Sequence, residues 1–135
     1  MTAAESSGQL PVRGESDIVL ARQRVRQLTQ ELKFSLVDQT KMITAASELS
    51  RNTLIYGGGG TMEWRILQEG VRAGLRLAFV DEGPGIADVT LAMKDGWTSG
   101  SGLGMGLSGS KRLVNEFDIQ SAPGRGTRVT ITRWK

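Results

Sequence analysis

The chain has no cysteine and no histidine among its 135 residues. Without them there is no disulfide framework, no Cys/His zinc site, no thiol nucleophile and no Ser-His-Asp triad. A phosphohistidine intermediate within this chain is excluded as well, because no imidazole is present to carry it. Carboxylates, hydroxyls, amides and the cations of Lys and Arg therefore remain for chemistry.

Aromatic residues and long apolar runs are scarce. Aromatic residues make up 5% of the chain, and they are too scattered to form a stacking platform for single-stranded nucleic acid. No apolar run of about 18 residues is present, and residues 1–11 lack the apolar middle of a signal peptide. The net charge of +3 is small, and the run Arg22, Arg24 and Arg26 would scatter around a helix. We expect a cytoplasmic protein that binds neither nucleic acid nor membranes.

Glycine is abundant, with 18 residues, and all but Gly8 and Gly14 fall between Gly57 and Gly126. The C-terminal two-thirds should therefore be built around loops. The length fits one domain with its own core. We predict a frayed tail over residues 1–8, because this stretch is small and polar, and a single domain over residues 9–135.

Apolar periodicity predicts the elements. A spacing of three to four predicts one helix that starts from a cap at Ser16 or Asp17 and another over residues 36–56, ended by the glycines 57–60. Alternation of apolar and polar residues predicts a hairpin of two strands, around 62–66 and 75–81, with a turn at 72–74. Further elements are expected as an edge strand at 9–13, helices at 86–93 and 107–117, and strands at 118–122 and 127–134. In the last of these, Val129 and Ile131 should face away from their polar neighbours.

This order of elements indicates the fold class. Runs of neighbouring strands joined by turns favour a mixed, mainly antiparallel sheet with helices on one face, a two-layer α/β sandwich. Strands and helices do not alternate regularly enough for a doubly wound sheet.

Three motifs could carry chemistry. Glu48 and Asn52 lie four apart on the second helix and share a face; the carboxylate can take a proton, and the amide oxygen suits Mg²⁺. Asp81, followed by Gly83 and Gly85, ends a strand and could accept a hydrogen bond from a purine amine. A glycine-rich stretch then leads into a helix, where backbone N–H groups can cradle phosphates; its glycines are Gly100, Gly102, Gly104 and Gly106. Taken singly, each motif also fits an ordinary structure: a solvated helix face for the first, a turn for the second and a flexible linker for the third.

Together, in this order and spacing, the three motifs resemble those of the GHKL ATP-binding superfamily, which has the Bergerat fold. Residues 48–52 resemble its N box, 81–85 its first glycine box, 100–106 its second glycine box and lid, and Gly126-Thr127 its closing element. The similarity extends to RsbT-type serine/threonine kinases, the switch kinases of the bacterial stressosome and its partner-switching modules. It rests on short segments spread from about residue 18 onward: Val37-Asp38-Gln39, Ser47-Glu48-Leu49, Gly102-Leu103-Gly104, Lys111-Arg112-Leu113, Glu116-Phe117 and Ser121-Ala122-Pro123-Gly124.

The resemblance implies a role for each matching residue. Asn52 would bind Mg²⁺, Asp81 would meet the adenine amine, and Thr127 would support the base with its hydroxyl. Gly83 and Gly85 would shape the adenine pocket. The glycines of the lid, Gly100, Gly102, Gly104 and Gly106, would close over the phosphates. Glu48 would be the base or orienting group for the acceptor hydroxyl, while Thr53 and Tyr56 replace the Ala and His that many relatives carry.

The resulting hypothesis is an ATP- and Mg²⁺-dependent kinase that phosphorylates Ser or Thr of STAS-domain antagonist proteins in stress signalling. By the same resemblance it would bind and activate a PP2C-type phosphatase. Lys111 or Arg112 could add positive charge near the phosphates. The alternative is an ATP-gated anti-sigma factor, whose main output is the capture of a sigma factor.

Overall fold

The computed structural model describes residues 7–86, 89, 93 and 106–135. Within these ranges no helix is both long enough and apolar enough to cross a membrane. The predicted lid residues Gly100, Gly102 and Gly104 lie outside the described residues, as does most of the helix expected at 86–93.

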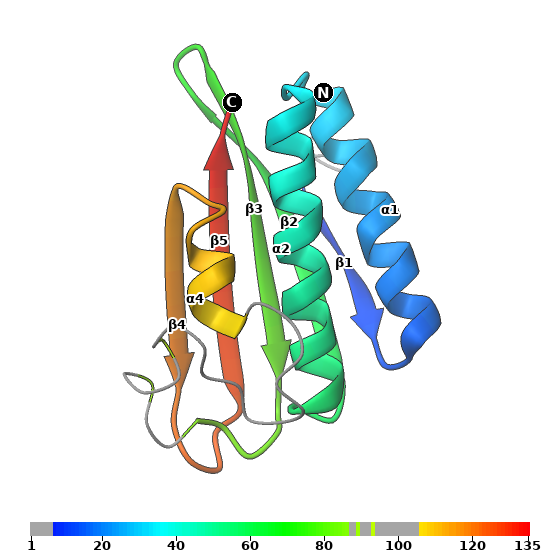
Figure 1. The fold of residues 1–135 in the computed structure, drawn as a ribbon, viewed down its shortest axis with the longest axis vertical. Coiled ribbons are helices and arrows are strands. Elements are labelled where there is room, and N and C mark those ends of the chain that lie inside the picture. The colour runs from blue at the N-terminus through cyan, green and yellow to red at the C-terminus, as the bar shows by residue number, and fades with distance from the viewer. Residues whose placement is uncertain (1–6, 87–88, 90–92, 94–105) are drawn as a thin grey trace.

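The described strands form one sheet, in which every pair is antiparallel. Their order across the sheet is β1-β2-β3-β5-β4 (Figure 1). The strands are β1 (Ser7–Val12), β2 (Gly60–Glu69), β3 (Arg72–Asp81), β4 (Glu116–Ser121) and β5 (Thr127–Trp134). Because β5 pairs with both β3 and β4, the last strand of the chain lies inside the sheet and β4 forms its edge.

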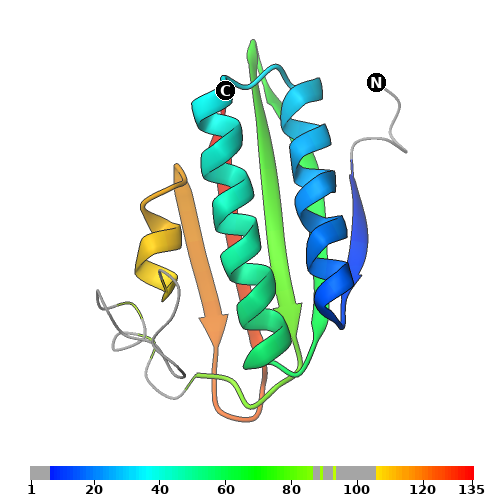
Figure 2. The ribbon, with the colours of Figure 1, turned by 45° about the vertical axis from the view of Figure 1, so that its right-hand side comes forward.

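The helices lie together on one face of this sheet, so the molecule has two layers (Figure 2). They are α1 (Glu15–Glu31), α2 (Leu36–Ile55) and α4 (Gly106–Lys111). The predicted two-layer α/β sandwich is confirmed, and the sheet is wholly antiparallel among the described strands.

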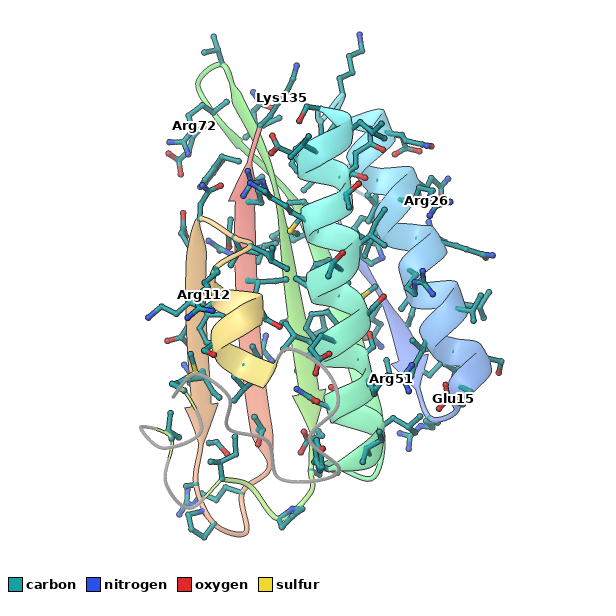
Figure 3. The ribbon with its side chains drawn as sticks, in the orientation of Figure 1. Glu15, Arg26, Arg51, Arg72, Arg112 and Lys135 are labelled. Atoms are coloured by element: carbon teal, nitrogen blue, oxygen red, sulfur yellow. The ribbon has the colours of Figure 1, made fainter. Side chains whose placement is uncertain are left out.

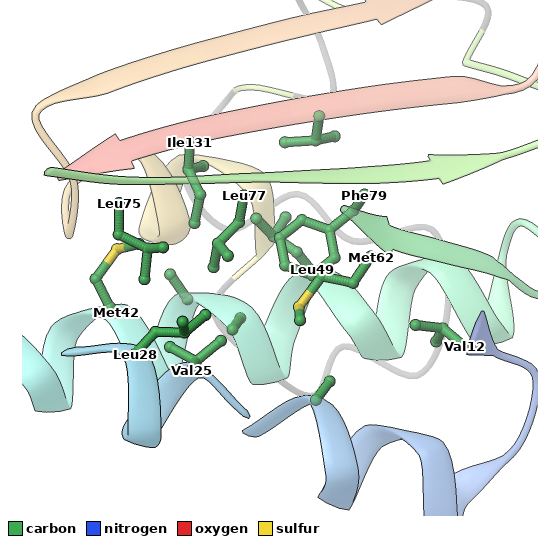
Figure 4. Close-up of a cluster of buried hydrophobic side chains, with 14 of the residues drawn as sticks. Val12, Val25, Leu28, Met42, Leu49, Met62, Leu75, Leu77, Phe79 and Ile131 are labelled. Atoms are coloured by element: carbon green, nitrogen blue, oxygen red, sulfur yellow. The ribbon is translucent and has the colours of Figure 1, made fainter. Parts of the chain in front are cut away.

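The core lies between the two layers and follows from the alternation in the strands (Figure 4). Leu75, Leu77 and Phe79 of β3 are almost fully buried against α2, which contributes Met42 and Leu49. In β5, Val129 and Ile131 are buried on the same side, as predicted. Truncating one of the buried leucines to alanine typically costs about 2–5 kcal/mol, so this row fixes the sheet against α2.

Several predicted boundaries were wrong. The first strand begins at Ser7, inside the predicted tail. Helix α1 is capped by Gly14, which is extended, and not by Ser16 or Asp17. Asp17 lies instead in the first turn, where its carboxylate accepts a hydrogen bond from the Arg13 N–H at 2.9 Å.

The hairpin turn lies at Gly70-Val71, two residues before the predicted one, because Glu69 pairs with Arg72. Gly70 has a φ of +60°, which suits the first central position of a two-residue hairpin loop. The helix predicted over residues 107–117 ends at Lys111. Phe117 lies in β4, where it and Ile119 alternate toward the core.

Charged side chains extend from the exposed faces of α1 and α2, among them Glu15, Arg26 and Arg51 (Figure 3). The arginine run of α1 is scattered as predicted: Arg26 is exposed, while the Arg24 guanidinium lies 5.8 Å from the centre of the Trp64 ring. Arg51 of α2 and Glu15 of α1 approach to 3.6 Å, but both are largely exposed. Exposed pairs of this kind add about 0–1 kcal/mol.

A better protected ion pair joins α2 to β5. The Arg133 guanidinium donates to Asp38 Oδ1 at 2.6 Å and to the Leu113 carbonyl at 3.0 Å. Only 15% of the Arg133 side chain and 25% of the Asp38 side chain are exposed. The hydrogen bond from Arg133 holds the pKa of the Asp38 carboxyl below its ordinary value of 3.8, although burial opposes the shift.

Asp38→Asn should destabilise the protein by about 1.5–3 kcal/mol near neutral pH, the usual range for a hydrogen bond to a charged group. Because the pKa of Asp38 is lower in the folded state, the contribution is present above 3.8 and is lost as pH falls through the folded-state pKa. Urea unfolding of wild type and variant should therefore show a gap at pH 7 that narrows in acid. Asp118→Asn, an exposed carboxylate on β4, is the matched control and should show almost no gap; an equal gap for both variants would contradict the assignment to the Arg133 pair.

Candidate functional site

One end of the two-layer structure encloses a pocket where α2 and β3 end and where β5 and α4 begin, at the bottom of Figure 1. The connections from α2 to β2 and from β4 to β5 both lie at this end. The lining is Glu48, Leu49, Asn52, Thr53, Tyr56, Gly57, Phe79, Asp81, Gly85, Ile86, Gly106, Leu107, Thr127 and Val129. Apolar side chains form the walls, and a few polar groups converge, as is typical of small-molecule sites.

The pocket brings together most of the residues singled out in the sequence. Its lining includes Glu48, Asn52, Asp81, Gly85, Gly106 and Thr127. Gly83 does not line it but donates its N–H to Asp81 Oδ1 at 2.9 Å. Gly100, Gly102 and Gly104 belong to the part of the chain that is not described.

Asp81 and Thr127 form the polar end of the pocket. They are direct cross-strand partners on β3 and β5, so their side chains stand on the same face with Cβ atoms about 4.5–5.5 Å apart. An ionised carboxylate has no proton to donate. A ligand group held between these two residues must therefore offer donors to Asp81.

Glu48 and Asn52 form a second polar group, one helical turn apart on α2. Both side chains are half-buried. Among the described residues, none forms a hydrogen bond or ion pair with the Glu48 carboxylate or the Asn52 amide. Their oxygens therefore keep lone pairs for a ligand, a metal ion or a proton.

The loop after β3 packs tightly on the turn between β4 and β5. Gly85 has a φ of +77°, and a Cβ at this position would lie 2.0 Å from the Ala122 carbonyl oxygen, so no other residue fits without rearrangement. The Gly124 N–H donates to the Pro84 carbonyl at 2.7 Å, and the Ile86 N–H donates to Ser121 Oγ at 2.8 Å. This wall of the pocket is thus held by backbone contacts and by the Ser121 hydroxyl.

A wider hollow, of about 870 Å³, lies on the sheet face that the helices leave uncovered. It is the more open of the two, and two of its arginines already have carboxylate partners. Arg128 pairs with Glu63 at 2.8 Å, and Arg76 with Glu116 at 3.5 Å. The smaller pocket is the better candidate because Glu48 and Asn52 have no side-chain partner among the described residues and because this pocket is the more enclosed of the two.

The sequence pattern of the family described as "Histidine kinase-, DNA gyrase B-, and HSP90-like ATPase" matches residues 37–135. The chain belongs to this ATPase family. The match covers both polar groups of the pocket. Membership of this ATPase family implies that the chain uses ATP.

Relatives place the chain more narrowly. It is 42% identical over 120 residues to serine/threonine-protein kinase RsbT of Bacillus subtilis (strain 168), covering 89% of this chain and 90% of that protein. It is 26% identical over 118 residues to an anti-sigma F factor of Thermoanaerobacter sp. (strain X514), covering 84% of this chain and 82% of that protein. The predicted RsbT-type serine/threonine kinase of the GHKL superfamily is confirmed as family and as enzyme class.

Solved structures support the fold of this ATPase domain. The crystal structure of the RsbU and RsbW domains of a Mycobacterium tuberculosis protein matches with a TM-score of 0.65 and 17% identity over 96% of this chain. The present chain spans about a third (33%) of the length of that chain. The mycobacterial sensor histidine kinase MprB matches with a TM-score of 0.53 and 16% identity, covering 94% of this chain and 96% of that chain.

The sequence pattern assigns Gly57 only the end of a helix, yet Gly57 also lines the pocket and packs against Asp81. A Cβ on Gly57 would lie 2.4 Å from Asp81 Cγ and 2.5 Å from Oδ2. The Gly83 Cβ position is also crowded, at 2.8 Å from the Gly57 backbone. The glycine run after α2 was the available signal, but its contact with the end of β3 depends on the tertiary fold.

The resemblance predicts that Asp81 meets the adenine amine, so Gly57→Ala should weaken binding of ADP by about tenfold or more. The added methyl group must displace the Asp81 carboxylate by roughly 1 Å to reach ordinary contact. Calorimetry with ADP measures the effect directly.

Gly58→Ala is the matched control for this variant. Gly58 has a φ of +75° and open space around its Cβ position, so alanine there costs about 1–2 kcal/mol of stability without touching Asp81. Thermal melts should show the loss for Gly58→Ala while its ADP affinity stays at the wild-type value. Equal ADP affinity in both variants would mean that Gly57 does not position Asp81.

Proposed function

We propose that this RsbT-type kinase uses Mg-ATP to phosphorylate a Ser or Thr of a STAS-domain antagonist protein and, when released from it, binds and activates a PP2C-type phosphatase. The observation that carries the proposal is the convergence of Glu48, Asn52, Asp81 and Thr127 on one pocket. The absence of histidine from the chain favours transfer straight from ATP to the acceptor.

The adenine end of the proposed site is Asp81 with Thr127. The Asp81 carboxylate would accept a hydrogen bond from the adenine amine, since it offers acceptors only. Gly83 and Gly85 would shape the base pocket indirectly, because they let the chain pass close to the Gly57 backbone and to the Ala122 carbonyl. The apolar walls, among them Phe79 and Val129, would cover the faces of the purine.

The residues present fit a magnesium ion held mainly through ATP. The described residues contain no group of three or more acidic, His or Cys side chains that could cage a metal, and Mg²⁺ characteristically takes one or two protein oxygens plus phosphates and water. Asn52 would supply its amide oxygen. The ion, when bound, would neutralise charge on the phosphates.

Glu48 would act on the acceptor hydroxyl, as base or orienting group. In the proposed step the acceptor oxygen bonds to the γ-phosphorus, the bond to the ADP oxygen breaks, and the hydroxyl proton passes to the Glu48 carboxylate. Positioning and charge stabilisation account for most of the barrier in phosphoryl transfer. The Glu48 carboxylate suits the role of base because it has no partner among the described residues and lies one helical turn from Asn52, the proposed Mg²⁺ ligand.

The rest of the phosphate site would come from the segment that leads into α4. Gly106, with a φ of +70°, opens this helix at the pocket, and we propose Gly100, Gly102 and Gly104 as the lid that closes over the phosphates. Lys111, at the end of α4, would add positive charge if the phosphates extend along this helix, and Arg112 follows it directly.

The proposed partners follow from the family. The anti-sigma F factor relatives raise the alternative that this protein captures a sigma factor under control of ATP. The higher identity to a serine/threonine kinase, 42% against 26%, supports phosphorylation as the main output. Pull-down with STAS, PP2C and sigma-factor baits separates the two outputs.

The direct test incubates the purified protein with γ-labelled ATP, Mg²⁺ and a candidate STAS protein. We expect label on Ser or Thr of the partner, none when EDTA removes the metal, and transfer reduced at least 100-fold in Asn52→Ala. Label that survives EDTA would refute the metal role of Asn52. A sigma-factor complex without any transfer to STAS proteins would favour the alternative.

A further inference from the structure

Ser121, the last residue of β4, lies behind Thr127 and makes three hydrogen bonds with its one hydroxyl. Its Oγ lies 2.8 Å from the Ile86 backbone nitrogen, 2.9 Å from the Gly126 carbonyl oxygen and 2.8 Å from Thr127 Oγ1. Ser121 itself does not line the pocket, whereas Thr127 does.

The direction of each bond follows from the chemistry of its partner. The Ile86 N–H can only donate, so Ser121 Oγ accepts from it. The Gly126 carbonyl can only accept, so it receives the single proton of Ser121. The arrangement that satisfies every group then requires Thr127 to donate its hydroxyl proton to Ser121 Oγ.

This bond determines which hydrogen-bonding groups the pocket offers to a ligand. With its proton committed to Ser121, Thr127 Oγ1 can offer only lone pairs to a ligand. Its cross-strand partner Asp81 is also an acceptor, with Oδ1 already receiving the Gly83 N–H. The polar end of the pocket is therefore a pair of acceptors and calls for a ligand group with two donors.

We infer that Ser121 is a positioning residue for base selection, which fixes Thr127 as an acceptor so that the pocket takes a 6-amino purine and rejects a 6-oxo purine. The inference rests on the proposed nucleotide function of the site. An exocyclic amine has two N–H donors, whereas a 6-oxo group presents lone pairs to those of Thr127. Sites built around buried hydrogen bonds discriminate strongly against a ligand that leaves them unpaired.

ADP and IDP are the probes, because they share everything except the 6-position and the proton at the neighbouring ring nitrogen. Calorimetry on the wild-type protein should give a Kd for IDP at least about 100-fold above that for ADP. In Ser121→Ala the Thr127 hydroxyl is free to turn and donate to the oxo group, so this ratio should fall about tenfold. Ser121→Thr retains the hydroxyl and should keep the wild-type ratio.

A purely structural role of Ser121 predicts a different result. If the side chain only anchors Ile86 and the β4–β5 turn, Ser121→Ala weakens ADP and IDP equally and the ratio stays unchanged, which would overturn the inference. A fall of the ratio in Ser121→Thr as large as in Ser121→Ala would overturn it too. Wild-type protein that binds neither nucleotide would instead refute the proposed function itself.

Thr127→Val offers a second route that leaves Ser121 in place. This substitution removes the acceptor, so the ratio should fall, and adding Ser121→Ala to it should change the ratio no further. If Ser121→Ala does not fold, Thr127→Val alone decides: a wild-type ratio in this variant would overturn the inference.

Discussion

Asp81→Asn should weaken ADP binding by about 100-fold, or beyond detection, while the protein remains folded. The carboxylate accepts in two directions: Oδ1 takes the Gly83 N–H at 2.9 Å, and the ligand amine needs a second acceptor. An amide has one oxygen, and its NH₂ group must then face one of these two donors. The expected loss corresponds to a hydrogen bond to a charged group, about 1.5–3 kcal/mol, together with an unpaired donor, about 1–3 kcal/mol.

Calorimetry with ADP measures the affinity, and circular dichroism with a thermal melt checks the fold. Glu82→Gln is the matched control, because it removes one negative charge from the next residue, which is exposed and outside the pocket lining. It should bind ADP as wild type does. If Asp81→Asn also bound ADP normally, the assignment of the adenine amine to Asp81 would be wrong.

The sequence predicted the parts of this site that depend on local pattern. Alternating apolar residues placed Asp81 at the end of a strand, and helical spacing placed Glu48 and Asn52 on one face. The glycines after residue 56 predicted where α2 ends to within one residue. In each case the signal lies within a few residues, where backbone preference and burial decide the structure.

What the sequence could not predict depends on contacts between distant segments. Ser121 bonds to Ile86 across 35 residues, and Arg133 reaches Asp38 across 95. Such contacts follow from the strand order, in which β5 is inserted between β3 and β4, and no local pattern encodes that order. Likewise, the apolar spacing that predicted one helix through Phe117 also fits a short helix followed by a turn and a strand. The pairing of β4 with β5 determines that the second arrangement forms.

Glu48→Gln should slow transfer of the γ-phosphoryl group about 10²–10⁴-fold, the usual contribution of a general base, and should change ADP affinity by less than about threefold. Glutamine keeps the size of the side chain and one hydrogen-bond acceptor but cannot take up the proton of the acceptor hydroxyl. Single-turnover transfer to a STAS partner, with calorimetry on ADP, separates the chemical step from nucleotide binding. Glu31→Gln, an equal charge change at the exposed end of α1, is the control and should transfer at the wild-type rate.

Because Glu48 lies one helical turn from Asn52, slow phosphoryl transfer by Glu48→Gln could also arise from weaker binding of Mg²⁺. If Glu48 acted mainly by holding the metal with Asn52, its loss would weaken the apparent affinity for Mg²⁺, and transfer would recover as Mg²⁺ is raised. Added Mg²⁺ cannot replace a general base, so transfer by Glu48→Gln should stay slow at saturating Mg²⁺. By contrast, Asn52→Asp keeps an oxygen ligand and should regain transfer as the Mg²⁺ concentration increases. Recovery of Glu48→Gln at high Mg²⁺ would assign the carboxylate to the metal and leave the proton of the acceptor hydroxyl to pass to water or to the phosphate itself.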